Sequence, residues 1–200
     1  MKLLWIDLET TGLDPAVDAI LEMAVIEADF DNPFKPLNKQ NFVLYYKPIV
    51  ATEASLTIVP GLKAGEFLQK GRAISQVVVD MHQASGLWSE CERSGNMLSA
   101  VENQLVYRYG VRADAVDDRS IVAGSSVHFD MGFLKAHMPR FHQTLSYRLY
   151  DTRTIQLFCR SLGMPQIPKK EAHRAMLDIE EAMDVGAQCA RWLTDGRFDA

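Results

Sequence analysis

Residues 2–14 read KLLWIDLETTGLD, and this stretch decides the fold prediction. An apolar run that ends in the turn signal Thr10–Gly12 predicts a β-strand over residues 2–9. Side chains two residues apart leave a strand on the same face, so Asp7 and Glu9 share a face at the carboxyl end of this strand. At the rim of a core such a pair is costly unless a hard cation meets it. An exposed strand end would carry the same two acids, so the pair alone leaves both interpretations open.

The rest of the chain continues with strands and then alternates helices with strands. Further strands are expected over residues 19–29, 41–48, 119–125 and 147–151. Helices are expected over residues 94–110, 128–138, 152–162 and from 172 to 193. The first three strands, joined by short loops, predict an antiparallel meander. The order as a whole predicts an α/β fold, in which helices flank a mixed central sheet of antiparallel and parallel strands.

The domain prediction is one unit over residues 1–195 and a short tail over residues 196–200. Residues 51–74 have weak periodicity and several glycine and proline breaks, so we expect an irregular insertion there rather than a second domain. The length of 200 residues is enough for a full hydrophobic core.

Composition excludes several classes of protein. The chain has 21 Lys and Arg against 26 Asp and Glu, a net charge of -5, which disfavours a protein that relies on long-range attraction to duplex DNA. Three cysteines without ligand-like spacing argue against a disulfide scaffold and favour the reducing cytoplasm. No apolar run is long enough for a membrane span, so we expect no membrane partner.

Three more polar residues complete a candidate catalytic set. Asp130 follows the expected buried strand 119–125 and opens the next helix, where it would also suit helix capping. Asp178 flanks the apolar stripe of the last helix, beside small residues. His173 lies at or before the start of that helix, where it would otherwise be an ordinary surface residue. Carboxylates that hold two divalent ions, with a histidine as general base, are suited to phosphodiester hydrolysis.

These residues resemble the DEDDh (DnaQ-like) superfamily of 3′-to-5′ exonucleases. The D-x-E motif with T-G after it is DLETTG at residues 7–12, the second acidic motif is HFDMGFL at 128–134, and H-x4-D is HRAMLD at 173–178. Within the superfamily the chain is most similar to oligoribonuclease. The segments that carry this likeness are DLETTGLD at 7–14, HQASGL at 82–87, GSSVHFD at 124–130 and YRLYDTRT at 147–154.

The resemblance implies an RNase H-like fold and a site for two divalent cations, Mg²⁺ or Mn²⁺. The implied metal ligands are Asp7, Glu9, Asp130 and Asp178, and the implied general base is His173. The implied reaction is 3′-to-5′ hydrolysis of short single-stranded RNA to 5′-mononucleotides.

The resemblance also implies substrate contacts and a homodimer. Leu13 would wedge against a base, and His82 would approach the nucleotide. Ser126 and Arg148 would cap the 5′ phosphate, and Tyr147 would reach in from the other subunit.

Three departures from the family pattern bear on substrate preference. Val77 stands where the family has a tryptophan, residues 51–74 look longer than the family's connection, and Thr10 replaces the usual methionine. They leave open a second enzyme function, the trimming or proofreading of longer single-stranded DNA or RNA. A non-catalytic nucleic-acid-binding protein on the same fold is a third hypothesis, although such a protein would not need all five catalytic-type residues.

Overall fold

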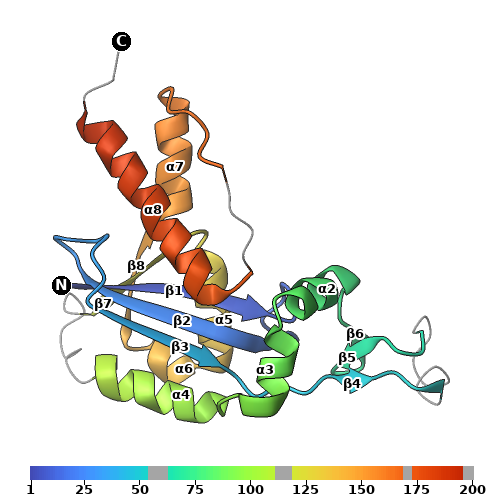
Figure 1. The fold of residues 1–200 in the computed structure, drawn as a ribbon. Helices are drawn as coiled ribbons and strands as arrows, with labels where there is room; N and C mark the ends of the chain where they lie inside the picture. The colour runs from blue at the N-terminus through green and yellow to red at the C-terminus, as the bar shows by residue number, and fades with distance from the viewer. Residues whose placement is uncertain (54–62, 111–118, 169–172, 196–200) are drawn as a thin grey trace.

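The protein folds around a five-stranded mixed sheet, as the computed structural model shows for residues 1–53, 63–110, 119–168 and 173–195 (Figure 1). The strand order is β3-β2-β1-β7-β8. β1 pairs antiparallel with β2, and β2 with β3, whereas β1–β7 and β7–β8 are parallel. The strand bounds are β1 Lys2–Thr10, β2 Ile20–Asp29, β3 Asn38–Val43, β7 Ser120–Gly124 and β8 Leu145–Asp151. The predicted meander and the mixed α/β sheet are confirmed.

Helices cover both faces of this sheet (Figure 1). Five of these helices form the crossover connections and the C-terminal part of the fold, and between them they lie on both faces. They are α4 Leu98–Leu105, α5 His128–His137, α6 Pro139–His142, α7 Thr152–Ser161 and α8 Ala175–Thr194. A second group lies beyond the end of β1: α2 Gln76–Ala84 and α3 Leu87–Ser94. Within the described residues no helix is long and apolar enough to cross a membrane.

Successive side chains of β1 point alternately into two hydrophobic cores, one on each face of the sheet. Leu4, Ile6 and Leu8 pack on one side with residues of α4, α5 and α6. Leu3 and Trp5 pack on the other side against α8. Because Asp7 and Glu9 continue the odd-numbered series, the alternation directs both carboxylates toward the α8 side of the sheet.

Several predicted boundaries differ from the structure. The strand expected over 41–48 is β3, which ends at Val43, and the helix expected over 94–110 is α4 followed by a π-helical turn at Val106–Gly110. A π turn widens the helix, which a periodicity of 3.6 residues does not report. The last helix begins at Ala175 rather than 172, and the expected tail 196–200 lies outside the described residues.

The expected insertion at 51–74 stays a prediction, and its described residues include short strands. A separate three-stranded sheet has the order β4-β5-β6: β4 Ile49–Val50 directly precedes this range, and β5 Phe67–Gln69 and β6 Arg72–Ala73 fall within it. Each strand is only two or three residues long, too short for an alternating pattern to stand out in the sequence. Residues 54–62 lie outside the described part of the chain.

Candidate active site

Three carboxylates meet beside the carboxyl half of β1. Asp7, Glu9 and Asp178 each offer one ligand atom, and these atoms all lie within 4.8 Å of one another. Two come from β1 and the third from the first turn of α8, so the sheet and its covering helix build the cluster together. An all-oxygen, all-anionic donor set of this kind fits Mg²⁺ or Mn²⁺ in preference to softer metals.

Asp130, which lies on helix α5, contacts the same strand β1. Its Oδ1 accepts a hydrogen bond of 3.0 Å from the backbone N–H of Leu8, the residue between Asp7 and Glu9. Asp130 is buried and is not part of the three-residue cluster. The sequence alternative of a helix cap does not describe this contact, because the carboxylate binds the backbone of β1. The structure therefore brings Asp130 to the site, although its carboxylate is not one of the three in the cluster.

Burial and mutual repulsion disfavour the ionised forms of the clustered carboxylates. Burial, and then the neighbouring carboxylates of Asp130, Asp178 and Glu9, raise the pKa of Asp7 well above its usual value. Burial, with Asp178 and Glu22 next, raises the pKa of Glu9 to about 8. A bound cation reverses both effects by favouring the ionised forms. The donor set thus fits divalent metal on its chemistry and on its charge.

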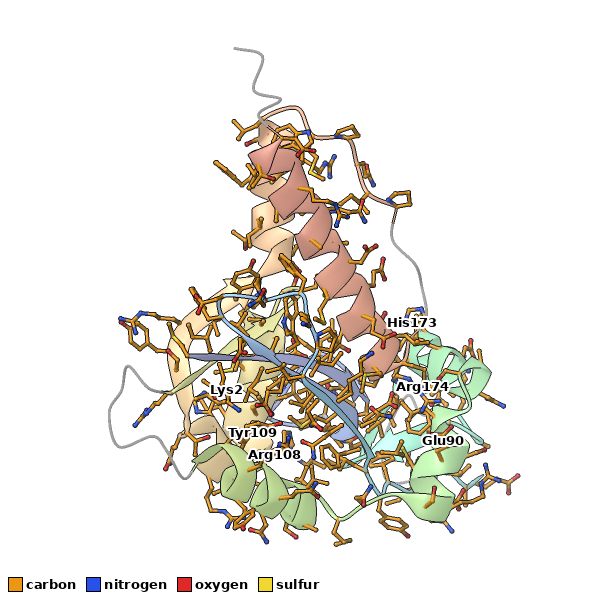
Figure 2. The ribbon with its side chains drawn as sticks, turned by 60° about the vertical axis from the view of Figure 1, so that its left-hand side comes forward. Lys2, Glu90, Arg108, Tyr109, His173 and Arg174 are labelled. Atoms are coloured by element: carbon orange, nitrogen blue, oxygen red, sulfur yellow. The ribbon has the colours of Figure 1, made fainter. Side chains whose placement is uncertain are left out.

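The three clustered carboxylates line a cleft, and His173 lines the same end of it. The histidine is on the turn that precedes α8, with a φ of 49°. A regular helix would separate His173 and Asp178 by about 140° around its axis. Because the histidine lies before the helix, that separation does not apply, and both side chains line one cleft. Figure 2 shows His173 above the first turn of α8 and Arg174 pointing toward Glu90.

Arg174 anchors this turn to two other elements. Its guanidinium bonds both carboxylate oxygens of Glu22 on β2, at 2.9 to 3.2 Å, and both oxygens of Glu90 on α3, at 2.9 and 3.1 Å. Glu22 also accepts the N–H of Ala175 at 3.0 Å. Burial opposes ionisation of Glu22, but the bonds from Arg174 and Asn41 lower its pKa overall. The backbone next to His173 is thereby held to both β2 and α3.

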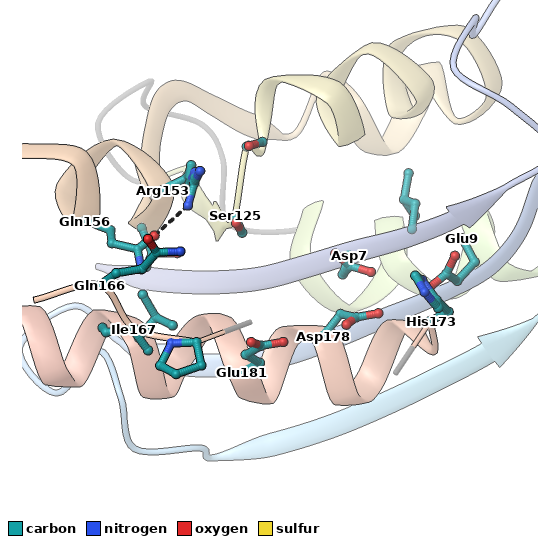
Figure 3. Close-up of a pocket in the computed structure, with 15 residues that line it drawn as sticks. Asp7, Glu9, Ser125, Arg153, Gln156, Gln166, Ile167, His173, Asp178 and Glu181 are labelled. Carbon is teal, nitrogen blue, oxygen red and sulfur yellow. Dashed lines mark hydrogen bonds between the residues drawn. The ribbon is translucent and has the colours of Figure 1, made fainter. Parts of the chain in front are cut away.

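The cleft has a volume of about 550 Å³ and runs along α8 away from the carboxylates. Figure 3 shows its far end lined by side chains from α7 and from the chain between α7 and α8: Arg153, Gln156, Gln166 and Ile167. Arg153 donates from Nη1 to Oε1 of Gln156 at 2.8 Å. Ser125 and Ser126 lie between the two ends. One end is therefore anionic, and the other offers a guanidinium, amides and hydroxyls.

Ser126 reaches the cleft through an unusual backbone. Its φ is 59°, and Asp151 holds the turn by accepting the N–H groups of Ser126 and Val127 at 3.2 and 3.1 Å. The same carboxylate caps α7 through the N–H groups of Arg153 and Thr154. The carboxylate of Asp151 therefore holds the backbone of Ser126 and the backbone of Arg153 together.

The remaining predicted contacts lie outside this cleft. Leu13 is 82% exposed on the loop after β1. His82 is 0% exposed, and its Nε2 lies 3.0 Å from the carbonyl oxygen of Thr10, so contact with a nucleotide would require α2 to move. Arg148 lies over the ring of Tyr147 and lines a different, more apolar pocket, together with residues that include Phe30 and Ile121. Within a single subunit, neither Arg148 nor Tyr147 lines the cleft.

Sequence reasoning missed the residues at the far end. Arg153 stands in the YRLYDTRT segment, five residues after the arginine that the resemblance selects, and it reaches the cleft because α7 packs against α8. Gln156 follows it on the same face of α7, and Glu181 follows Asp178 by one turn of α8. The helical spacing of Asp178 and Glu181 was the signal available in the sequence.

Comparisons with known proteins agree with this geometry. The exonuclease family RNase_T matches residues 4–88. The mitochondrial oligoribonuclease of Mus musculus is 34% identical over 187 residues, which cover 91% of this chain and 69% of that protein. A probable oligoribonuclease of Dictyostelium discoideum is 30% identical over 92% of this chain and 85% of its own length.

The chain belongs to the oligoribonuclease family. Among solved structures, Escherichia coli exonuclease I in complex with a 5cy-dT13 oligonucleotide matches with a TM-score of 0.60, at 16% identity and over 99% of this chain. The chain spans 42% of the length of that exonuclease, so this likeness concerns the fold alone. The predicted RNase H-like exonuclease fold is confirmed.

Proposed function

We propose that this oligoribonuclease-family protein is a metal-dependent 3′-to-5′ exoribonuclease that hydrolyses short oligoribonucleotides to 5′-mononucleotides. The observation that carries the proposal is the cluster of Asp7, Glu9 and Asp178 within 4.8 Å, in a cleft that also contains His173. Membership of the oligoribonuclease family supports the reaction and the RNA substrate.

Each residue of the anionic end has a proposed task. Asp7, Glu9 and Asp178, with Asp130 behind them, would hold two divalent cations, Mg²⁺ or Mn²⁺. Bound there, the cations would supply charge neutralisation at the scissile phosphate and a lower pKa for the attacking water. The imidazole of His173 would take the proton from that water as the general base, for which a pKa near neutrality is suited.

The far end of the cleft would bind the rest of the substrate. The guanidinium of Arg153 and the amides of Gln156 and Gln166 offer donors to a phosphate oxygen, with the Ser126 hydroxyl beside them. In this proposal Arg153 takes the phosphate contact within the subunit. The roles expected for Arg148 and Tyr147 remain predictions about a homodimer, in which the exposed side chains of the edge strand β8 would face the partner.

The proposed compartment is the reducing cytoplasm, and the basis is the state of the cysteines. Cys91, Cys159 and Cys189 are all free and buried.

Light scattering would test the proposed homodimer, and a monomer at working concentration would contradict it.

A matched pair of variants on α8 tests the reaction. Asp178→Asn keeps the shape of the side chain but removes a charge from the cluster, whereas Asp184→Asn makes the same change at an exposed position one and a half turns later. Loss of several kcal/mol of charge stabilisation at the scissile phosphate lowers kcat by roughly a hundredfold or more. We expect that loss for Asp178→Asn and wild-type kcat for Asp184→Asn. Equal activity of the two variants would contradict the proposal.

Substrate length needs a separate measurement. The decay of a labelled diribonucleotide is compared with that of a longer single strand of RNA or DNA at equal concentration, with Mg²⁺ or Mn²⁺ present. The proposal predicts a higher kcat/KM for the diribonucleotide. A strong preference for the longer strand would instead favour the trimming or proofreading exonuclease.

A further inference from the structure

The small β4-β5-β6 sheet contacts the loop after β1. This loop, residues 12–18, begins three residues after Glu9 and carries the exposed Leu13. Its base is closed by a pair of hydrogen bonds between Thr11 and Ala19: the N–H of Thr11 donates to the Ala19 carbonyl at 3.0 Å, and the N–H of Ala19 donates to the Thr11 hydroxyl at 2.9 Å.

The loop is wrapped around one buried carboxylate, that of Asp18. This carboxylate accepts the N–H of Asp14 at 2.9 Å and the hydroxyl of Thr11 at 3.3 Å. The packing is so close that a Cβ on Gly12 would lie 2.4 Å from Oδ2 of Asp18. The position of Asp18 therefore determines the path of the backbone that carries Leu13.

The β5–β6 hairpin holds the outer side of this loop with three consecutive contacts. Gln69 donates from Nε2 to the carbonyl of Val17 at 2.6 Å, and Lys70 donates from Nζ to the carbonyl of Ala16 at 3.0 Å. Arg72 donates from Nη2 to Oδ1 of Asp18 at 2.8 Å. The three donors come from one hairpin of the insertion, and they meet three successive residues, 16 to 18, of the loop.

The hairpin itself is built to keep these donors in register. Its two central residues, Lys70 and Gly71, have φ values of 46° and 77°, the pattern of a type I′ turn, whose twist matches that of the paired strands. Gln69 is fixed from behind, because its Oε1 accepts the hydroxyl of Tyr46 at 2.8 Å. Gln69 and Arg72 also pair across the hairpin.

We propose that the β5–β6 hairpin is a positioning device for substrate binding, in which Arg72 acts through Asp18 to hold Leu13 against the terminal nucleobase. The proposal rests on the proposed function, because it takes a nucleobase as the partner of Leu13. An exposed apolar side chain on a loop whose backbone is already held offers a contact surface with less loss of loop entropy on binding. Arg72 and Gln69 touch no substrate in this proposal.

The first test measures the loop without any substrate. Hydrogen exchange of the amides in residues 12–18 is compared for the wild type, Arg72→Ala, Arg72→Lys and Lys47→Ala, the last being an exposed cation that pairs with Glu92 away from the loop. We expect exchange about tenfold faster in Arg72→Ala only, because local opening of the loop becomes easier. Unchanged exchange in Arg72→Ala would overturn the proposal.

The second test separates positioning from chemistry. For Arg72→Ala we expect the KM for a diribonucleotide to rise about three- to tenfold, with kcat within about twofold and with recovery in Arg72→Lys. Bis(p-nitrophenyl) phosphate has a phosphodiester but no nucleobase, and its kcat/KM should be unchanged. An equal loss on both substrates would mean that the hairpin supports the fold as a whole and would overturn the proposal.

A double-mutant cycle asks whether Arg72 acts through Leu13. In a Leu13→Ala background, Arg72→Ala should raise the KM no further, because the positioned group is already absent. Additive effects of the two changes would overturn the proposal. If the wild type failed to hydrolyse oligonucleotides at all, the proposed function would fall, and the hydrogen-exchange result would still decide whether the hairpin holds the loop.

Discussion

Without divalent metal, the protein should become less stable as the pH rises, because several of its buried carboxylates have raised pKa values. Burial and neighbouring acids raise the pKa of Glu9 to about 8 from an ordinary value of 4.5, and burial raises that of Asp130 to about 7 from 3.8. An acid whose pKa is higher in the folded state takes up a proton on folding. The free energy of unfolding therefore falls as the pH rises between the two values, by about 1.4 kcal/mol per pH unit.

The pH range from 6.5 to 8 isolates this effect. Burial lowers the pKa of His82 from 6.5, so its opposing contribution lies below that pH, and acids with lowered pKa values, such as Glu22, act below 4.5. Across the range, Glu9 contributes a loss of roughly 1.5 kcal/mol and Asp130 somewhat less than 1 kcal/mol. In the metal-free protein these two acids therefore cost about 2 kcal/mol, which is a fall in Tm of roughly 4 to 8 °C for a chain of this size, and the raised pKa of Asp7 adds a loss of the same sign.

Thermal unfolding in a chelator, and again in saturating Mg²⁺, measures the effect. We expect the stabilisation by Mg²⁺ to be larger at pH 8 than at pH 6.5, because metal binding requires ionised ligands. Glu9→Gln should make the pH dependence of the metal-free protein shallower, whereas Asp7 and Asp130 still contribute to it. Glu102→Gln is the matched control, because Glu102 is a buried acid paired with Arg140 and its pKa is lowered. Metal-free stability that is constant or rises over this range, or an unchanged slope in Glu9→Gln, would refute the reasoning.

Three further substitutions have expected outcomes that follow from single contacts. Arg153→Ala should raise the KM for a 5′-phosphorylated dinucleotide about tenfold with a smaller effect on kcat, because a charge-assisted phosphate contact is lost; steady-state kinetics would show no change if Arg153 faces solvent. Arg174→Ala should lower the free energy of unfolding by roughly 3 kcal/mol, because Glu22 is fully buried and would lose its cation; urea denaturation measures this, and a loss near zero would contradict it. Gly186→Ala should cost about 1–3 kcal/mol, because a Cβ there would lie 2.6 Å from Phe34, and an unchanged Tm would contradict this.

The anionic end of the cleft was predictable because its residues follow local rules. The period of two along β1 assigns Asp7 and Glu9 to one face, and the apolar residues of α8 show which face of that helix meets the sheet. The position of His173 was open in the sequence, since a helical start there would have turned it away from Asp178. The structure places it on the preceding turn, with a positive φ that no sequence pattern indicated.

The far end of the cleft and the small sheet were not predictable in the same way. Arg153 and Gln166 are 13 residues apart, with the end of α7 and a turn at Gly163 between them, and they meet only because α7 packs on α8. The strands of the small sheet were not predicted because strands of two or three residues carry no period. The sheet's one local signal, the Lys70–Gly71 turn, is weaker than the Asn-Gly or Asp-Gly pairs typical of type I′ turns.

The acidic balance of the chain has a structural counterpart in the cleft. Among the described residues that line it, four are carboxylates, Asp7, Glu9, Asp178 and Glu181, and Arg153 is the one permanent cation. Two divalent ions would offset the carboxylates but would leave few positive groups for further phosphates. A strand that extended over many nucleotides would need a series of basic contacts along its backbone, since each phosphate carries a charge. A substrate with one or two phosphates needs only the metal site and Arg153, so the charges among the described lining residues suffice for the short oligonucleotide of the proposed function.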